Sequence, residues 1–236
     1  MEESTLEYNY KIEEEAIAYI KRNQKLIQSV FADPSNFPPA NKPVSIFMAG
    51  SPGAGKTEFS KRFIKDSGRA IVRIDADDIR NILPMYNTNA SLMQKASALG
   101  VEKVYDFALH HCQDLILDGT LVDFHKAESN IQRSLNHNRL VQVFYIYQDP
   151  VVAWEFTKKR ELIEHREIPK DFFIKSFFQS KDNANRLKAK FGEDIELNLV
   201  IKNFQNDIDR FMLDIDEVDS YLKMSYTEDI LQELLQ

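Results

Sequence analysis

Residues 50 to 57 read Gly-Ser-Pro-Gly-Ala-Gly-Lys-Thr, which is a complete G-x-x-x-x-G-K-[ST] pattern. The apolar run Val44-Ser45-Ile46-Phe47-Met48-Ala49 directly precedes it, so a buried strand is expected to lead into a phosphate-binding loop. A helix is expected to open behind the loop and to add its positive N-terminal dipole to an anion bound there. The residues expected to bind the phosphates of a nucleoside triphosphate are Gly50, Ser51, Pro52, Gly53, Ala54, Gly55, Lys56 and Thr57.

Two side chains of this motif have separate predicted tasks. Lys56 is expected to reach the outer phosphates, and Thr57 is expected to bind Mg²⁺ through its hydroxyl. Glycine-rich turns that bind no nucleotide exist, but they lack the Lys-Thr pair at the start of a helix. The motif therefore predicts the use of ATP with Mg²⁺.

Composition limits the remaining possibilities. The chain has 236 residues, 43% of them hydrophobic and 28% charged, which suits one α/β domain with additions. Its net charge of −7 makes nucleic acid an unlikely partner, because neutralising phosphates needs clustered Lys and Arg. No apolar run is long enough to span a bilayer, and the acidic N-terminus does not resemble a signal peptide, so a cytoplasmic location is predicted. The single cysteine, Cys112, is expected to be a packed thiol on an apolar helix.

The order of elements predicts the fold class. An amphipathic helix is expected near the N-terminus, and the proline-rich stretch 33–39 is expected to end it. We therefore divide the chain into an N-terminal helix with linker, 1–40, and a P-loop kinase domain, 41–236. Strands are predicted at 44–49, 70–74, 114–117, 140–147 and 196–201, with helices near 56–66, 93–112, 124–137, 150–166 and 170–191. This alternation predicts a parallel sheet with helices on both faces. The apolar spacing after Asp207 predicts a final docking helix.

Three carboxylates follow the second predicted strand, in Ile74-Asp75-Ala76-Asp77-Asp78-Ile79-Arg80. Asp75 or Asp77 could simply cap the next helix, with Asp78 in its first turn. Alternatively, one of them accepts the proton of an attacking hydroxyl and another holds Mg²⁺ through water, as phosphoryl transfer requires. Capping explains one aspartate but not three, so the catalytic interpretation is favoured.

A further carboxylate, Asp118, ends the apolar run Asp114-Leu115-Ile116-Leu117 and precedes Gly119. An acid in that place can fix the water shell of the metal beside the phosphate loop, although an ordinary aspartate before a glycine turn is the alternative. No Glu follows Asp118, which argues against a motor-type ATP hydrolase. The only Asn-Lys pair, Asn41-Lys42, precedes the phosphate loop, so the guanine-reading motif of GTPases has no candidate.

Cations cluster between Lys158 and Arg166, after the strand predicted at 140–147. By charge alone this run would be a solvated helix face, because acids are interspersed in it. Its location changes that interpretation, since the element after this late strand commonly forms the lid of small P-loop kinases and carries arginines that stabilise the transferring phosphoryl group.

Taken together, these motifs resemble the zeta toxins, the P-loop kinases of toxin–antitoxin pairs. The resemblance rests on Phe47–Thr57, on Ile-Asp-x-Asp-x-Ile-Arg with Pro84 and Tyr86 behind it, on Leu-Asp-Gly-Thr, and on Arg160 with Arg166 three residues before Pro169. It runs from about Val44 to about Asn203. Characterised zeta toxins phosphorylate UDP-N-acetylglucosamine at the sugar 3′-hydroxyl with ATP, and an antitoxin holds them inactive.

The resemblance implies roles for single residues. Asp77 would be the base, Lys56 and Thr57 would hold ATP and Mg²⁺, and Arg160 and Arg166 would be the lid arginines. The placement of the carboxylates at strand ends, independently of this resemblance, assigns Asp75 and Asp118 to the metal site. Contacts to the acceptor would come from Asp77, Glu102, Thr120 and Asn130, the last of which stands where the family can have a Thr.

The function predicted is an ATP-dependent small-molecule kinase that phosphorylates a sugar hydroxyl, with UDP-N-acetylglucosamine as the expected acceptor and an antitoxin protein as a possible partner. A kinase acting on an antibiotic hydroxyl or on a nucleic-acid end is one alternative. A regulatory protein in which ATP orders the lid without any transfer is another. The acids at 75–78 favour the enzyme, because a sensor needs the phosphate loop but no base.

Overall fold

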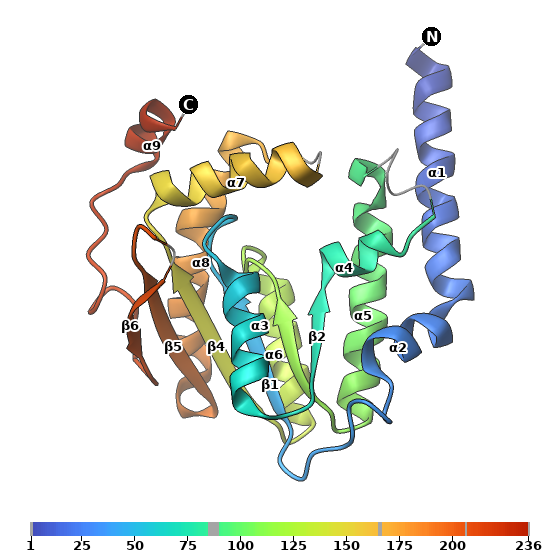
Figure 1. The fold of residues 1–236 in the computed structure, drawn as a ribbon, viewed down its shortest axis with the longest axis horizontal. Coiled ribbons are helices and arrows are strands. Elements are labelled where there is room, and N and C mark those ends of the chain that lie inside the picture. The colour runs from blue at the N-terminus through green and yellow to red at the C-terminus, as the bar shows by residue number, and fades with distance from the viewer. Residues whose placement is uncertain (1, 85–89, 165–166, 206, 236) are drawn as a thin grey trace. The chain divides into compact units, whose positions relative to one another are not determined.

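The computed structural model describes residues 2–84, 90–164, 167–205 and 207–235. Its chain forms two compact units, one comprising Met1–Asn41 with Ala70–Leu117 and the other Lys42–Arg69 with Asp118–Gln236. We describe each unit by itself; Figure 1 labels their elements.

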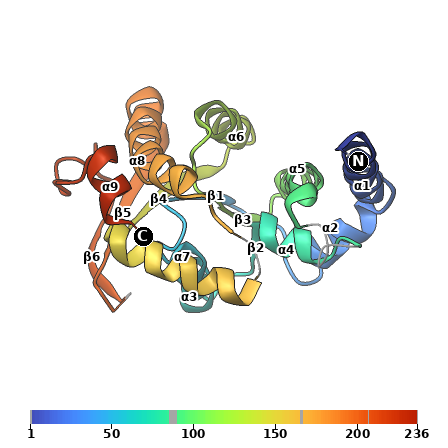
Figure 2. The same cartoon turned by 90° about the horizontal axis from the view of Figure 1, so that it is seen from above.

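The second unit is built around a sheet with helices on both faces. Its strands are β1 (Val44–Ala49), β4 (Leu140–Tyr147), β5 (Ile195–Lys202) and β6 (Ile208–Met212), in that spatial order. The first three are parallel, with Val44 opposite Leu140 and Val141 opposite Ile195, whereas β6 is antiparallel to β5. Figure 2 shows α3 (Lys56–Ser67) on one face and α6 (Phe124–Asn136) and α8 (Lys170–Phe191) on the other. The predicted class, a mostly parallel α/β sheet covered on both faces, is confirmed.

Two further helices complete this unit. They are α7 (Pro150–Glu164), which follows β4, and α9 (Glu228–Leu234), near the C-terminus. Leu231 and Leu235 pack in one apolar cluster with Ala153 and Trp154 of α7 and with residues of α8. Short 3-10 turns lie at Gly192–Asp194 and, in the other unit, at Ala90–Met93.

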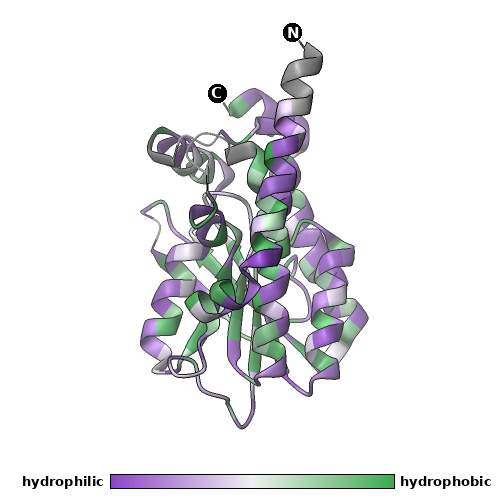
Figure 3. Ribbon diagram, turned by 90° about the vertical axis from the view of Figure 1, so that its right-hand side faces the viewer, coloured by the Kyte–Doolittle hydropathy of each residue, from purple (hydrophilic) through white to green (hydrophobic). Residues whose placement is uncertain are grey.

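The first unit contains the strands β2 (Ile71–Asp75) and β3 (Asp114–Asp118), which are neighbours in the sheet order. The last residue of β3, Asp118, is assigned to the second unit. Its helices are α1 (Glu2–Arg22), α2 (Gln24–Ala32), α4 (Ala76–Asn81) and α5 (Gln94–His110). The apolar side chains Ile12, Ile20 and Ile27 of α1 and α2 are buried, and both helices pack against α5. Hydrophobic and hydrophilic segments alternate along α1 in Figure 3, as expected for a helix with one covered face.

The N-terminal helix differs from the prediction in one respect, because it is two helices that meet at Asn23. The Asn23 side chain donates to the Tyr19 carbonyl at 2.9 Å, a local bond that competes with helix continuation. The helical part ends at Ala32, before the proline-rich stretch, as expected. Gln113 fixes that stretch by donating to the carbonyls of Ala32 at 2.8 Å and Phe37 at 2.7 Å.

Two predictions are wrong. The segment after Asp207 begins as the edge strand β6, because the Asn203 side chain accepts hydrogen bonds from the N–H groups of Gln205 and Asp207, each at 2.9 Å, and turns the chain back along β5. Cys112 is exposed, with a φ of 51°, in the turn that ends α5, so it is not a packed helical thiol. Tertiary pairing overrides apolar spacing in the first case, and the second is an error in the helix boundary.

None of the helices within the described ranges has an apolar stretch long enough to cross a membrane.

Candidate active site

The phosphate-binding loop lies in the second unit, between β1 and α3. Every residue of β1 is buried, so the strand fixes the position at which the loop begins. Gly50, Gly53 and Gly55 have φ values of 137°, 73° and 82°, which L-residues with side chains rarely adopt. The helix α3 begins directly at Lys56, so its first N–H groups belong to the loop. This is the backbone geometry that the motif predicts for a polyphosphate site.

Gly53 also allows the loop to touch α7. A Cβ atom at this position would lie 2.0 Å from the Ala153 carbonyl oxygen and 2.6 Å from the Thr157 hydroxyl. A Cβ atom at Gly50 would lie 2.4 Å from the Ile146 carbonyl oxygen. Backbone cannot yield at such distances, so any side chain at either position would push the loop away from β4 and α7.

Lys56 folds back over its own loop. Its ammonium group donates to the carbonyl oxygens of Gly50 at 3.0 Å and Ser51 at 2.7 Å. These contacts hold the charge at the centre of the turn, where the phosphate oxygens of a bound nucleotide would replace or share the carbonyl partners. Its contact with the outer phosphates stays a prediction.

Asp118 and Ser60 extend the site beyond the loop. Ser60 donates to the Asp118 carboxylate at 2.9 Å and lies 3.1 Å from the Thr57 carbonyl oxygen. Ser60 was not identified from the sequence, although a hydroxyl one helical turn after Thr57 is a usable signal. A threonine hydroxyl and a carboxylate are hard oxygen donors of the kind that bind Mg²⁺ together with phosphate and water, so the donor set fits that ion.

The acidic segment lies in the first unit, at the junction of β2 and α4. Asp75 is the N-cap of α4 and accepts from the Asp77 N–H at 2.8 Å, so the capping interpretation accounts for this aspartate. Arg73 forms ion pairs with both Asp75 and Asp78, and Arg80 pairs with Asp77. Arg80 is 5% exposed, whereas Asp77 is 35% exposed. The buried Arg80 guanidinium fixes the orientation of the Asp77 carboxylate, which is partly open to solvent. A carboxylate in this situation can accept a proton from a bound hydroxyl.

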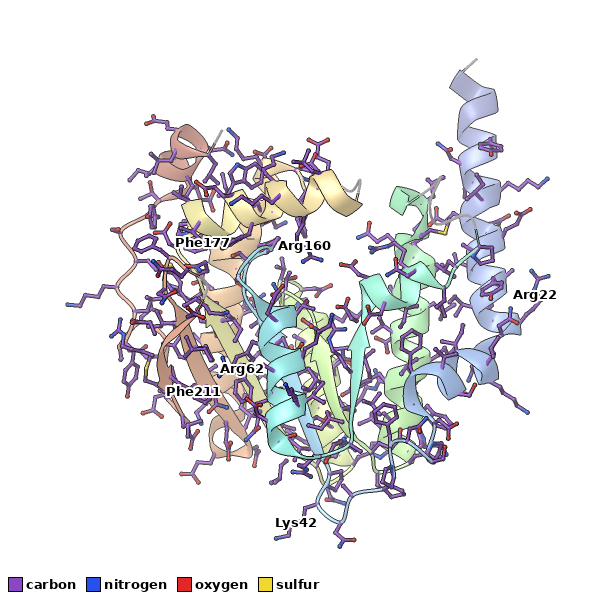
Figure 4. All side chains as sticks on the ribbon, in the orientation of Figure 1. Arg22, Lys42, Arg62, Arg160, Phe177 and Phe211 are labelled. Atoms are coloured by element: carbon purple, nitrogen blue, oxygen red, sulfur yellow. The ribbon has the colours of Figure 1, made fainter. Side chains whose placement is uncertain are left out.

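Of the two predicted lid arginines, Arg160 lies in α7. Arg160 is exposed, and Figure 4 shows it beneath α7, on the side of the turn between β1 and α3. Lys158 pairs with Glu161 at 2.9 Å and lies 4.8 Å from the centre of the Trp154 ring, so the solvated-face alternative describes Lys158. Arg166 lies outside the described residues, as does Tyr86.

Comparison with known proteins identifies the family. The family model described as zeta toxin matches residues 28–211. The chain belongs to the zeta toxin family. No curated protein matches the chain significantly.

Solved structures support the fold of this zeta toxin family member. A chain from the PezAT chromosomal toxin–antitoxin system of the human pathogen Streptococcus pneumoniae aligns with a TM-score of 0.61 and 20% identity over 96% of this chain and 87% of that one. The AvrRxo1-ORF1:AvrRxo1-ORF2 structure with sulphate ions aligns with a TM-score of 0.60 and 14% identity over 89% of this chain and 70% of the other. The AvrRxo1-ORF1:-ORF2 structure with ATP gives 0.58 and 14% over 86% and 65%. At these identities the likeness concerns the fold alone.

The resemblance to zeta toxins implies three further acceptor contacts besides Asp77, and these residues lie on different elements. Glu102 is half-buried on α5, in the first unit. Thr120 is half-buried in the loop after Asp118, and its carbonyl accepts from the Gly50 N–H at 3.4 Å. Asn130 is buried on α6, where it accepts from Arg133 at 3.0 Å. All three roles stay predictions.

Proposed function

We propose that this protein is an ATP-dependent kinase that transfers the γ-phosphoryl group to a hydroxyl of a small molecule. The observation that supports this most directly is the position of the Lys56 ammonium inside a glycine-rich turn, with Thr57 and the Ser60–Asp118 pair beside it in the same unit. Such an array serves a nucleoside triphosphate and its metal. The ATP in the AvrRxo1-ORF1:-ORF2 structure adds support from a protein of similar fold.

Nucleotide binding is assigned to residues of the second unit. The N–H groups of the loop and of the first turn of α3 would receive the phosphates, and Lys56 would contact the outer ones. Thr57 and Asp118 would hold Mg²⁺, which neutralises phosphate charge when bound. Asp75 has a weaker claim as a metal residue, because its oxygens already accept from the Asp77 N–H and from Arg73.

Asp77 is the proposed base. It would orient the acceptor hydroxyl and take its proton as the oxygen attacks the γ-phosphorus. The γ-phosphoryl group moves to that oxygen, the bond to the β-phosphate oxygen breaks, and ADP leaves. Arg160 and Arg166 would stabilise the charge on the transferring group, as lid arginines do.

The acceptor that we propose is a nucleotide sugar, and UDP-N-acetylglucosamine is the first candidate, because the chain belongs to the zeta toxin family, whose model matches residues 28–211. We also propose a protein partner of the antitoxin type, since the similar chain of Streptococcus pneumoniae comes from a toxin–antitoxin system. The cytoplasmic location stays a prediction.

The decisive experiment incubates the protein with ATP, Mg²⁺ and UDP-N-acetylglucosamine and searches by mass spectrometry for a product heavier by one phosphate. Parallel reactions contain an aminoglycoside, a nucleic acid with a free 5′-hydroxyl, or no acceptor. Lys56→Ala serves as the inactive control. A product only with another acceptor would correct the substrate, and tight ATP binding without any product would favour the regulatory alternative.

A further inference from the structure

The loop that follows Asp118 contains a strained residue. Leu121 has a φ of 60°, in the left-handed region that residues with a Cβ atom adopt at an energetic cost. Leucine has no polar side chain that could stabilise this conformation locally, unlike Asn or Asp. The surrounding structure must therefore impose it.

Asn183 supplies that constraint from α8. Its side-chain amide donates to the carbonyl oxygen of Leu121 at 2.9 Å and to that of Val122 at 2.7 Å. The Asn183 side chain is 4% exposed, so water does not compete strongly for either bond. Its own oxygen accepts from Arg186 at 3.3 Å, which fixes the orientation of the amide with its donors toward the loop. One buried side chain thus satisfies two consecutive carbonyls at the strained position.

The beginning of the same loop contacts the phosphate-binding segment through two residues. At its beginning, Asp118 accepts from Ser60 of α3. One residue before Leu121, the Thr120 carbonyl accepts from the Gly50 N–H of the phosphate loop at 3.4 Å. A Cβ atom built on Gly119 would meet nothing within 4 Å, so the loop backbone is open on that side. Gly119 and Thr120 therefore lie beside the phosphate loop, and the hydrogen bonds from Asn183 of α8 fix the backbone of the two residues that follow them.

We propose that Asn183 is a positioning residue, which holds the loop 119–122 in the one conformation that presents Thr120 to the acceptor. This inference rests on the proposed kinase function and deepens it. Asn183 contacts neither nucleotide nor acceptor; it acts through the backbone of Leu121 and Val122. Strain that is retained in this way is typical of segments that must be pre-organised for a ligand.

The test uses Asn183→Asp, which has nearly the same shape but no donor for the two carbonyls, and Asn183→Ala, which remains informative if the buried charge prevents folding. The matched control is Asn185→Ala on the same helix. Asn185 bridges α8 to a different segment, donating to Asp219 at 2.6 Å and accepting from the Val218 N–H at 2.8 Å. Asn185→Ala therefore measures how far stability falls when α8 loses a side chain that links it to another segment.

Two measurements are made on each variant. Hydrogen exchange of residues 119–123, which needs no acceptor, should become faster in both Asn183 variants and stay unchanged in Asn185→Ala. The KM for the acceptor should rise about tenfold or more in the Asn183 variants, while the Kd for ATP stays within about twofold. Unchanged exchange in the loop, or faster exchange with an unchanged acceptor KM, would overturn the proposal.

A rescue variant separates positioning from general destabilisation. Leu121→Gly removes the cost of the left-handed conformation, so it should recover part of the acceptor KM when combined with Asn183→Ala. Equal acceptor KM values in Asn183→Ala and in the double variant would contradict the mechanism. If the wild-type protein turned over no acceptor, the kinase proposal would fail by itself, and loop exchange would still decide whether Asn183 fixes the loop.

Discussion

Ser60 donates its hydroxyl proton to Asp118 at 2.9 Å and thereby joins the first turns of α3 to the last residue of β3. The Thr57 carbonyl lies 3.1 Å from the same hydroxyl, so one proton faces two acceptors. The ionised carboxylate is the stronger acceptor. Ser60 therefore fixes the rotamer of the carboxylate that we assign to the metal.

The first prediction concerns this pair. Ser60→Ala should raise the Mg²⁺ concentration needed for half-maximal activity, because Asp118 loses its fixed orientation, and should cost about 1 kcal/mol of stability. Titration of activity with Mg²⁺ measures the effect. The matched control is Ser67→Ala at the end of the same helix, where the hydroxyl donates to the Ile64 carbonyl at 2.9 Å and accepts from the Arg69 N–H at 3.2 Å, with no carboxylate among these partners. Identical dependence of activity on Mg²⁺ concentration in both variants would contradict the assignment of Asp118 to the metal site.

The second prediction separates Lys56 from Asp77. Lys56→Ala should weaken ATP binding and turnover together, because the ammonium contacts phosphates that are charged before and during transfer. Asp77→Asn should reduce turnover alone, since the base acts only as the hydroxyl attacks. Calorimetry gives the ATP affinity of each variant.

Asp78→Asn is the control for Asp77→Asn, because each change removes one carboxylate charge that faces an arginine, Arg73 or Arg80. Similar turnover in these two variants would assign the effect of Asp77 to the ion pair. An equal loss of ATP affinity in Lys56→Ala and Asp77→Asn would make Asp77 a metal or capping residue.

The sequence was sufficient to predict the elements whose causes are local. The buried run of β1, the glycine turn and the start of α3 follow one another directly, so the motif predicted the loop and the place of Lys56. The strand β6 was not predictable from its apolar spacing, because it depends on the free edge of β5 and on the turn at Asn203.

The residues of the candidate site also differ in whether local sequence or tertiary contacts determine their partners. Ser60 could have been identified by its spacing of one turn from Thr57. Arg73 and Arg80 stand on either side of the three aspartates in the sequence, which shows their charges but not their pairing with particular aspartates. Asn183 gave no signal at all, since its partners are carbonyl groups of Leu121 and Val122, which any residue type supplies.

The third prediction tests the lid. Arg160→Ala and Arg166→Ala should stay folded and lose nearly all activity, because an arginine on the transferring group can be worth a factor of about a thousand or more. Arg160 is exposed, and changes at exposed positions alter stability by only about 0.5 kcal/mol, so the melting temperature of Arg160→Ala should stay unchanged. Lys159→Ala, which removes an exposed cation next to Arg160, is the control. More than about a tenth of wild-type turnover in both variants, a loss of about 1.4 kcal/mol, would support the solvated-face alternative.

The fourth prediction follows from the base of α7. Tyr226 donates to Asp149 at 2.6 Å, and the other oxygen of Asp149 accepts from the Val151 N–H at 3.0 Å at the start of the helix. The hydrogen bond to Asp149, together with burial, raises the pKa of Tyr226 from 10.0 to about 12. The folded state thus favours the protonated phenol, and this stabilisation is complete below about pH 10 and lost as the pH rises toward 12.

Tyr226→Phe should therefore lower the free energy of unfolding near neutral pH and reduce the further loss above about pH 10. Burial raises the pKa of Tyr147 to about 12 as well, so part of the alkaline loss should remain in the variant. Denaturant unfolding at several pH values measures both effects, with Tyr221→Phe as the control for an exposed phenol. Parallel pH profiles for the wild type and Tyr226→Phe would show that the Asp149 contact is absent in solution.

The last prediction concerns the N-terminal helices. Ile12, Ile20 and Ile27 are 3%, 0% and 1% exposed, and the helices that carry them pack against α5. Burial of each such side chain contributes about 1.5–3 kcal/mol, so the three together rival the total stability of a typical domain. A chain that begins near Asn41 should therefore be insoluble or strongly destabilised.

The competing hypothesis is that residues 8–31 restrain the kinase or dock an antitoxin near the ATP site, and it predicts a soluble truncation with raised activity. Point variants separate the two before any truncation is made. Ile20→Ala should cost about 2–5 kcal/mol if α1 is core, whereas Leu26→Ala, at a site that is 56% exposed, should cost little. Raised turnover in Ile20→Ala without a lower melting temperature would indicate a restraint. A soluble truncation with unchanged stability and activity would contradict both hypotheses, because the buried stripe would then have no energetic role.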